Sequence, residues 1–109
     1  MNPDPVHPPY VCVWEFEVPA SARAEFLRYY GPGGTWETLF RLDPEYIGTQ
    51  LLEDRARSGR FLTVDRWRTE RAFQDFRVRY AERYAALDRE CESLTSRETS
   101  LGAFYEVPA

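Results

Sequence analysis

The stretch that decides the fold is Arg60-Phe-Leu-Thr-Val-Asp-Arg-Trp-Arg-Thr69, followed at once by Glu-Arg-Ala-Phe-Gln-Asp-Phe76. Its alternation predicts a strand over 60–67, and a Thr stands where it can cap the helix that follows. The side chains that share one face of this strand are Phe61, Thr63, Asp65 and Trp67. A carboxylate and an indole therefore lie together beneath a helix, either as a core with a polar member or as the wall of a ligand pocket.

The rest of the chain supplies the other elements of one sheet and its helices. We expect further strands at 10–18, 46–53 and about 100–107. We expect a first helix capped by Ser21 and ending before Gly31, and a short helical segment capped by Thr35. The apolar stripe over 72–91 predicts one long helix or two helices broken near residue 80. This order predicts an α+β, ferredoxin-like, four-stranded antiparallel sheet with helices on one face.

Such a fold leaves the other face of the sheet uncovered. On the first strand that face carries Val11 and Val13. On the second strand it carries either Ile47, Thr49 and Leu51 or their alternates. An apolar face of that size is unusual in a monomer, so we expect two copies to pack sheet to sheet as a homodimer.

Length and charge limit the class of protein. The 109 residues are enough for one domain, which we place at 10–107 after a flexible, proline-rich arm at 1–9. The net charge of −4, without a basic patch, argues against nucleic acid and anionic membranes as partners. We expect a cytoplasmic protein, because no signal peptide or membrane-spanning run is visible. Cys12 and Cys91 are expected to be buried, reduced thiols.

Missing residue types exclude much chemistry. All 14 basic residues are Arg, and the single His and the single Asn lie in the first nine residues. The domain therefore lacks the groups needed for a Schiff base, a histidine base or a Ser-His-Asp nucleophile. It also lacks the imidazoles of zinc and iron sites, and no phosphate-binding loop is present. We expect neither a metal nor a cofactor.

A family resemblance rests on five stretches of the chain. These are Val13-Trp-Glu-Phe-Glu-Val18, Tyr30-Gly-Pro-Gly-Gly-Thr-Trp-Glu-Thr-Leu-Phe40, Tyr46-Ile-Gly-Thr-Gln-Leu-Leu52, the strand 61–67, and Leu101-Gly-Ala-Phe104. Together they resemble the antibiotic biosynthesis monooxygenase family of the dimeric α/β-barrel superfamily, over nearly all of residues 10–106. The resemblance implies a homodimer whose two sheets face each other, with a pocket between sheet and helices in each subunit. It also implies cofactor-free oxidation of aromatic, polyketide-like phenols by molecular oxygen; related branches degrade haem or act as cyclases or isomerases.

Carried over residue by residue, the resemblance fits in part. Trp67 matches a tryptophan that lines the family pocket. The phenol oxidisers resemble one another in an Asn on the same strand face, where this chain has Thr63. The haem degraders need an Asn where the nearest equivalent here is Trp14, and a helix His where this chain offers Gln74 and Arg77. The missing axial ligand argues against haem degradation.

The candidate site residues each have a functional and a structural interpretation. Asp65 is a general base whose pKa is raised by burial, or the partner of a nearby arginine, or a residue on the opposite face of the sheet. Trp36 is either a lid over the pocket mouth or a packing residue against the first helix. Arg77 could anchor a ligand anion. The residues that could frame a flat ligand, or simply form core, are Trp14, Phe16, Trp67, Phe76 and Tyr80, with Thr63 and Tyr80 as hydrogen-bond donors.

The leading hypothesis is a cofactor-independent monooxygenase-like protein that oxidises an electron-rich aromatic, polyketide-like phenol with O₂. Asp65 would be the base, Trp67 and Trp14 would be the stacking walls, and the hydrogen-bond donors would be Thr63, Tyr80 or Arg77. The alternatives are a non-catalytic dimer that binds a small hydrophobic molecule, and a polyketide cyclase or isomerase that uses the same pocket without oxygen.

Overall fold

The computed structural model describes residues 8–108 of the chain. Its strands are β1 (Tyr10–Glu17), β2 (Tyr46–Glu53), β3 (Arg60–Trp67) and β4 (Arg97–Tyr105). Its helices are α1 (Arg23–Tyr30), α2 (Thr35–Phe40), α3 (Glu70–Arg79) and α4 (Ala81–Cys91), with 3₁₀ turns η1 (Ala20–Ala22) and η2 (Glu92–Leu94). The arm predicted at 1–9 lies, apart from its last two residues, outside the described residues.

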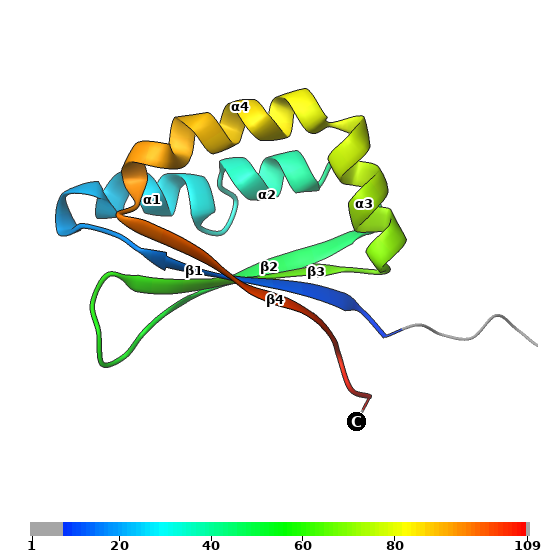
Figure 1. Cartoon of the computed structure of the whole chain (residues 1–109), viewed down its shortest axis with the longest axis horizontal. Coiled ribbons are helices and arrows are strands. Elements are labelled where there is room, and N and C mark those ends of the chain that lie inside the picture. Colours follow the sequence, from blue (N-terminus) through cyan, green and yellow to red (C-terminus); the bar gives the residue numbers. More distant parts are fainter. Residues whose placement is uncertain (1–7, 109) are drawn as a thin grey trace, which may run out of the picture.

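The four strands form one antiparallel sheet in the order β2-β3-β1-β4. All helices lie on one side of this sheet, and the other side is left open (Figure 1). The α+β, ferredoxin-like architecture predicted from the element order is therefore confirmed. No helix within 8–108 combines the length and the apolar character that crossing a bilayer requires.

The register of the strands decides which side chains meet under the helices. Asp65 on β3 lies opposite Thr49 on β2 and Cys12 on β1, and Thr63 lies opposite Trp14. Because paired residues point to the same side of a sheet, these side chains share the helix-covered face. Of the two alternatives for β2, Thr49 and Leu51 thus face the helices, and the register shift between Tyr46 and Gly48 puts Tyr46 on the same face. The uncovered face takes the alternate positions, of which Leu52 is an example.

One of the three expected helix caps is present. The backbone N–H of Ala72 donates to Oγ1 of Thr69 at 3.0 Å, which starts α3 as predicted. Ser21 is not a cap, which corrects that prediction. The chain leaves β1 through the turn η1, and α1 begins only at Arg23, without a side-chain cap.

The cap predicted at Thr35 is also wrong. Thr35 is already the first residue of α2, and Gly34 precedes it as the cap residue. The side chain of Glu37 binds the backbone before the helix instead: the backbone N–H of Gly33 donates to its carboxylate at 2.6 Å. Glu37 is in turn paired with Arg41 one helical turn later.

The apolar stripe over 72–91 is divided between two helices. Tyr80, with φ −111° and ψ 28°, ends α3 and begins α4. After this break the two helices run in clearly different directions (Figure 1). α3 packs down on the end of β3, while α4 passes over the sheet at a distance. The break therefore makes room for a space under α4.

Two aromatic clusters hold the layers together. One joins Phe16, Phe26 and Phe61, with Phe26 stacked on Tyr30 at 4.4 Å between ring centroids. The other surrounds Trp67, and Trp67 and Phe76 are both 0% exposed. Cys12 and Cys91 are buried free thiols, as predicted.

Candidate functional site

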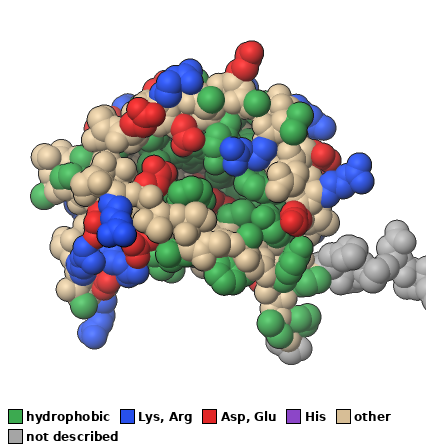
Figure 2. All heavy atoms as spheres, in the orientation of Figure 1, with side chains coloured by type: hydrophobic (Ala, Val, Ile, Leu, Met, Phe, Trp, Pro, Cys, Tyr) green, Lys and Arg blue, Asp and Glu red, His purple; other side chains and the backbone are tan. Residues whose placement is uncertain are grey.

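A cavity of about 360 Å³ lies between the sheet and the helices. Figure 2 shows it as a hollow with an apolar lining and with charged side chains around its opening. Its volume falls in the usual range for small-molecule pockets, about 300–1,000 Å³. The floor is formed by the inward side chains of the three strands β1, β2 and β3, namely Trp14, Phe16, Thr49, Leu51, Thr63 and Asp65.

Asp65 is the polar centre of this floor. It is half-buried and borders the cavity, and desolvation by the surrounding protein raises the pKa of its carboxyl group to about 6. Oγ1 of Thr49 donates a hydrogen bond of 2.6 Å to Oδ1 of Asp65, which opposes the shift only in part. Within 8–108 no arginine pairs with Asp65, so the arginine alternative does not describe this site.

Thr49 connects Asp65 to a second hydroxyl. Tyr46 and Thr49 share a short hydrogen bond between their oxygens. Because Thr49 gives its own proton to Asp65, Tyr46 must be the donor to Thr49. The three side chains form a relay from the buried phenol to the carboxylate, and its geometry leaves Oδ2 of Asp65 free of hydrogen bonds from the described residues.

The roof of the cavity is aromatic and carries one cation. Its side chains are Tyr30, Trp36, Phe40, Arg77 and Tyr84. The guanidinium of Arg77 lies over the ring of Tyr84, 4.0 Å from its centroid. Burial raises the pKa of Tyr84 to about 12, so its hydroxyl keeps its proton at neutral pH and can donate to a ligand.

Trp36 is a fixed part of this roof. It is 8% exposed, and its ring contacts Tyr30 of α1 and Tyr84 of α4 at centroid distances of 6.0 and 5.1 Å. It therefore both packs against the first helix and borders the cavity. Its Nε1 is buried and has no hydrogen-bond acceptor within 8–108.

Three predicted pocket residues lie elsewhere. Trp67, Phe76 and Tyr80 are not part of the cavity lining. Trp67 shares the inward face of β3 with Asp65, but α3 packs directly on this end of the strand. The ring of Phe76 lies 5.0 Å from that of Trp67 and 5.1 Å from that of Tyr80, and these contacts fill the space. Trp67 and Phe76 are core, and Tyr80 is half-buried against them.

The other predicted residues border the cavity. These are Trp14, Phe16, Trp36, Thr63, Asp65 and Arg77. The structure thus brings Asp65 together with aromatic walls from β1 and α2, as the pattern predicted; what each residue does there stays a prediction. Sequence reasoning missed Thr49, Tyr30 and Tyr84, although Tyr84 lies in the apolar stripe that predicted the helix.

Carboxylates gather at the opening of the cavity. Asp88 at the end of α4, Glu92 in η2 and Glu98 on β4 line it and are exposed. Partial burial raises the pKa of Glu98, and the neighbouring carboxylates raise it further. Partial burial also raises the pKa of Asp88, although the nearby Arg77 lowers it in part. Within 8–108 no set of three or more acidic, Cys or His side chains is arranged to hold a metal ion.

Comparison with known structures agrees with this architecture. Neither a protein-family model nor a curated protein sequence matches the chain. Among solved structures, SnoaB of Streptomyces nogalater, a cofactor-independent oxygenase, is similar at 17% identity and a TM-score of 0.68 over 94% of this chain and 96% of SnoaB. A protein of Nitrosomonas europaea, provisionally named an antibiotic biosynthesis monooxygenase, is similar at 10% identity and a TM-score of 0.74, over 93% and 92% of the two chains.

A third structure, of a Deinococcus radiodurans protein with the same provisional name, reaches a TM-score of 0.72 at 14% identity, over 92% of this chain and 94% of the other. Likeness at such identities is evidence of shared fold. The chain has the fold of the antibiotic biosynthesis monooxygenases, which is the fold that the resemblance implied.

Proposed function

We propose that this protein is a cofactor-independent monooxygenase that oxidises an electron-rich, phenolic aromatic with O₂. The observation that carries the proposal is a half-buried carboxylate, with a pKa of about 6, in the floor of an aromatic cavity. The shared fold with SnoaB, a cofactor-independent oxygenase, supports it as an analogy.

Each cavity residue has a task in such a reaction. Oδ2 of Asp65 takes the proton of the substrate, and the resulting anion is the electron donor to O₂. Trp14 and Phe16 hold the ring by stacking, and the roof keeps water away from the anion. Thr63, Arg77 and Tyr84 supply donors for the developing oxyanion. One oxygen atom enters the ring as a carbonyl, and the other leaves as water with the two hydrogens that the substrate loses.

Oxygen consumption tests the proposal directly. We expect uptake of O₂, and formation of the quinone, with a simple anthrone or a dihydroxynaphthalene. Asp65→Asn keeps the shape of the site and removes the base, so kcat should fall about 100-fold or more. The matched control is Asp75→Asn on the exposed face of α3, which should leave kcat unchanged. A protein that binds these compounds but consumes no O₂ would be a non-catalytic binding protein or an oxygen-independent cyclase or isomerase.

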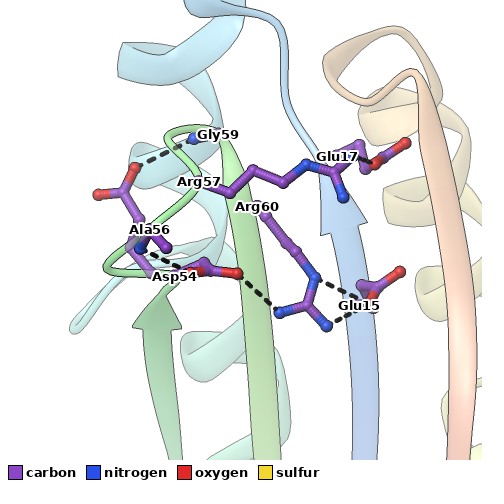
Figure 3. Close-up of polar contacts among 8 residues, drawn as sticks. Glu15, Glu17, Asp54, Ala56, Arg57, Gly59 and Arg60 are labelled. Atoms are coloured by element: carbon purple, nitrogen blue, oxygen red, sulfur yellow. Dashed lines mark hydrogen bonds and ion pairs between the residues drawn. The ribbon is translucent and has the colours of Figure 1, made fainter.

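We also propose that two copies pack through the open faces of their sheets. The centre of that face is apolar, with Val13 of β1 beside Val64 of β3 and with Leu52 46% exposed on β2. One end carries a polar network, in which Arg60 reaches Glu15 at 2.6 Å and Asp54 at 3.1 Å (Figure 3). An apolar centre with a paired, polar border is the usual anatomy of a homodimer interface.

A further inference from the structure

The carboxylates at the opening of the cavity are not compensated by arginines. Asp88, Glu92 and Glu98 form no ion pair within 8–108. Other acidic residues of the chain are paired with an arginine, as Glu15 and Glu53 are. Three neighbouring carboxylates without partners repel one another, and this arrangement opposes folding.

The single cation that borders the cavity does not cancel this charge. Arg77 acts on Asp88, but its guanidinium is held over the ring of Tyr84. Glu37, a fifth acidic residue of the lining, is already paired with Arg41. The opening is therefore negative at neutral pH, with Glu92 and Glu98 left unbalanced.

A second, independent feature inside the cavity also attracts positive charge. Asp65 is half-buried and borders the cavity, and its Oδ2 has no hydrogen-bond partner within 8–108. The aromatic walls add to this, because the faces of Trp and Tyr rings are negative and stabilise a nearby cation. Trp14 of the floor and Tyr84 of the roof both border the cavity.

We infer that the cavity takes a flat aromatic ligand that carries a protonated amine, with the ring between floor and roof and the ammonium beside Asp88, Glu92 and Glu98. The inference rests on the proposed function for the identity of the site, and it names the class of substrate. An ammonium at the opening keeps part of its hydration, so it gains the attraction of the carboxylates without the full cost of desolvation. An anionic ligand of the same shape is repelled.

Three probes with one ring system and different tails test the inference. Naphthylethylamine is a cation at pH 7, naphthylethanol is neutral and naphthylacetate is an anion. Binding is followed by quenching of tryptophan fluorescence without oxygen, since Trp14 and Trp36 border the cavity. We expect the amine to bind about tenfold more tightly than the alcohol, which is the effect of a few partly screened charges. Raising NaCl from about 0.05 to about 0.5 M should reduce this ratio, because salt shortens the reach of exposed charges.

Matched variants assign the preference to the three carboxylates. In the triple variant Asp88→Asn, Glu92→Gln and Glu98→Gln the ratio of amine to alcohol affinity should fall to about one. The control removes the same number of charges from exposed positions outside the cavity lining, with Glu25→Gln, Glu45→Gln and Glu82→Gln, and should keep the ratio. Equal binding of amine and alcohol by the wild-type protein overturns the inference, as does tighter binding of naphthylacetate.

The binding preference for the amine and the oxidation by O₂ can fail independently of each other. Uptake of O₂ with an uncharged anthrone, together with no preference for the amine, overturns this inference alone. A clear amine preference that is lost in the triple variant supports the inference even where no tested aromatic consumes O₂, and in that case the proposed oxidation fails by itself.

Discussion

At the scale of single residues, Asp65 stands out because two opposing effects act on one carboxyl group. Burial disfavours the anion, and the hydrogen bond from Thr49 favours it. Burial is the larger effect, because the pKa rises from 3.8 to about 6. At neutral pH the group is thus an anion in a position that opposes ionisation. Such a carboxylate is a poor stabiliser of the fold and a reactive acceptor of protons.

Removing the hydrogen bond should shift this balance further. In Thr49→Val the donor to Asp65 is lost while the shape of the side chain is kept, so the pKa of Asp65 should rise above 6 by about 0.5–1 unit, as expected for a bond of about 1 kcal/mol. The carboxyl titration followed by NMR measures this shift. Thr63→Val is the matched control, since Thr63 borders the same cavity and makes no hydrogen bond to Asp65. An unchanged or lower pKa in Thr49→Val would contradict the role given to Thr49.

The raised pKa also makes a prediction for stability. A carboxyl group with a pKa of 3.8 when unfolded and about 6 when folded favours the folded state below pH 3.8. That contribution is lost as the pH rises through about 6, and the full change is about 3 kcal/mol at about 1.4 kcal/mol per pKa unit. Asp65→Asn cannot ionise, so its free energy of unfolding relative to wild type should increase by up to this amount between pH 4 and pH 7. Urea unfolding at the two pH values measures it.

The control for this experiment is Asp75→Asn, whose carboxyl group is exposed beside Arg71. Its difference from wild type should change little with pH. A constant difference between Asp65→Asn and wild type would mean that burial does not hold the pKa of Asp65 high.

How far the site followed from the sequence depends on the residue. The alternation of β3 and β1 placed Asp65, Thr63 and Trp14 under the helices, because a period of two needs no knowledge of neighbours. Thr49 could not be placed, since its face follows from the register of the hairpin, and the length of the 54–59 loop alone does not determine that register. Trp67 has the correct face but lies in the core, because α3 covers its end of the strand.

At the scale of elements, the sequence pattern predicted the strands but did not decide whether the stripe over 72–91 forms one helix or two. A stripe at spacings of three and four is the same in one helix as in two consecutive helices, so the sequence left both open. Tertiary packing selects two helices, because Phe76 of α3 packs on Trp67 of β3 whereas Tyr84 of α4 packs on Trp36 of α2. The cavity depends on this break, and its volume was therefore not predictable from the stripe.

The loop between β2 and β3 supplies an element-scale prediction. Gly59 has φ +87°, and a Cβ there would lie 2.6 Å from the carbonyl oxygen of Val18, which follows β1. Gly59→Ala should lower the free energy of unfolding by about 3 kcal/mol, through backbone strain and through the clash. Gly33 is the matched control, because it has φ +74° with no atom within 4 Å of a Cβ, so Gly33→Ala should cost only about 1 kcal/mol. Equal losses in urea unfolding would show that the clash is relieved at no cost.

At the scale of the whole molecule, the helices cover one face of the sheet and leave the other open (Figure 1). The open face has an apolar centre, and β4 adds Phe104, which is 50% exposed beside Val11. Its charged groups are largely paired with one another, as Arg66 is with Glu106. A face with its charges already neutralised and its centre apolar favours a second copy of the same chain over an oppositely charged partner.

A single charge at the centre of that face should separate the copies. Val64 lies on β3 between Val13 and Gln50, so the two-fold axis of a sheet-to-sheet dimer brings both copies of Val64→Arg into the interface. Burying an unpaired guanidinium costs about 3–5 kcal/mol, which lowers the association constant by more than 100-fold. Light scattering should give twice the chain mass of 12.8 kDa for wild type and a single chain mass for the variant.

The control variant Val78→Arg makes the same change on the helix side, where Val78 is 80% exposed, and should remain a dimer. A wild-type mass of one chain would contradict the sheet-to-sheet arrangement, and dissociation of both variants would place the interface elsewhere.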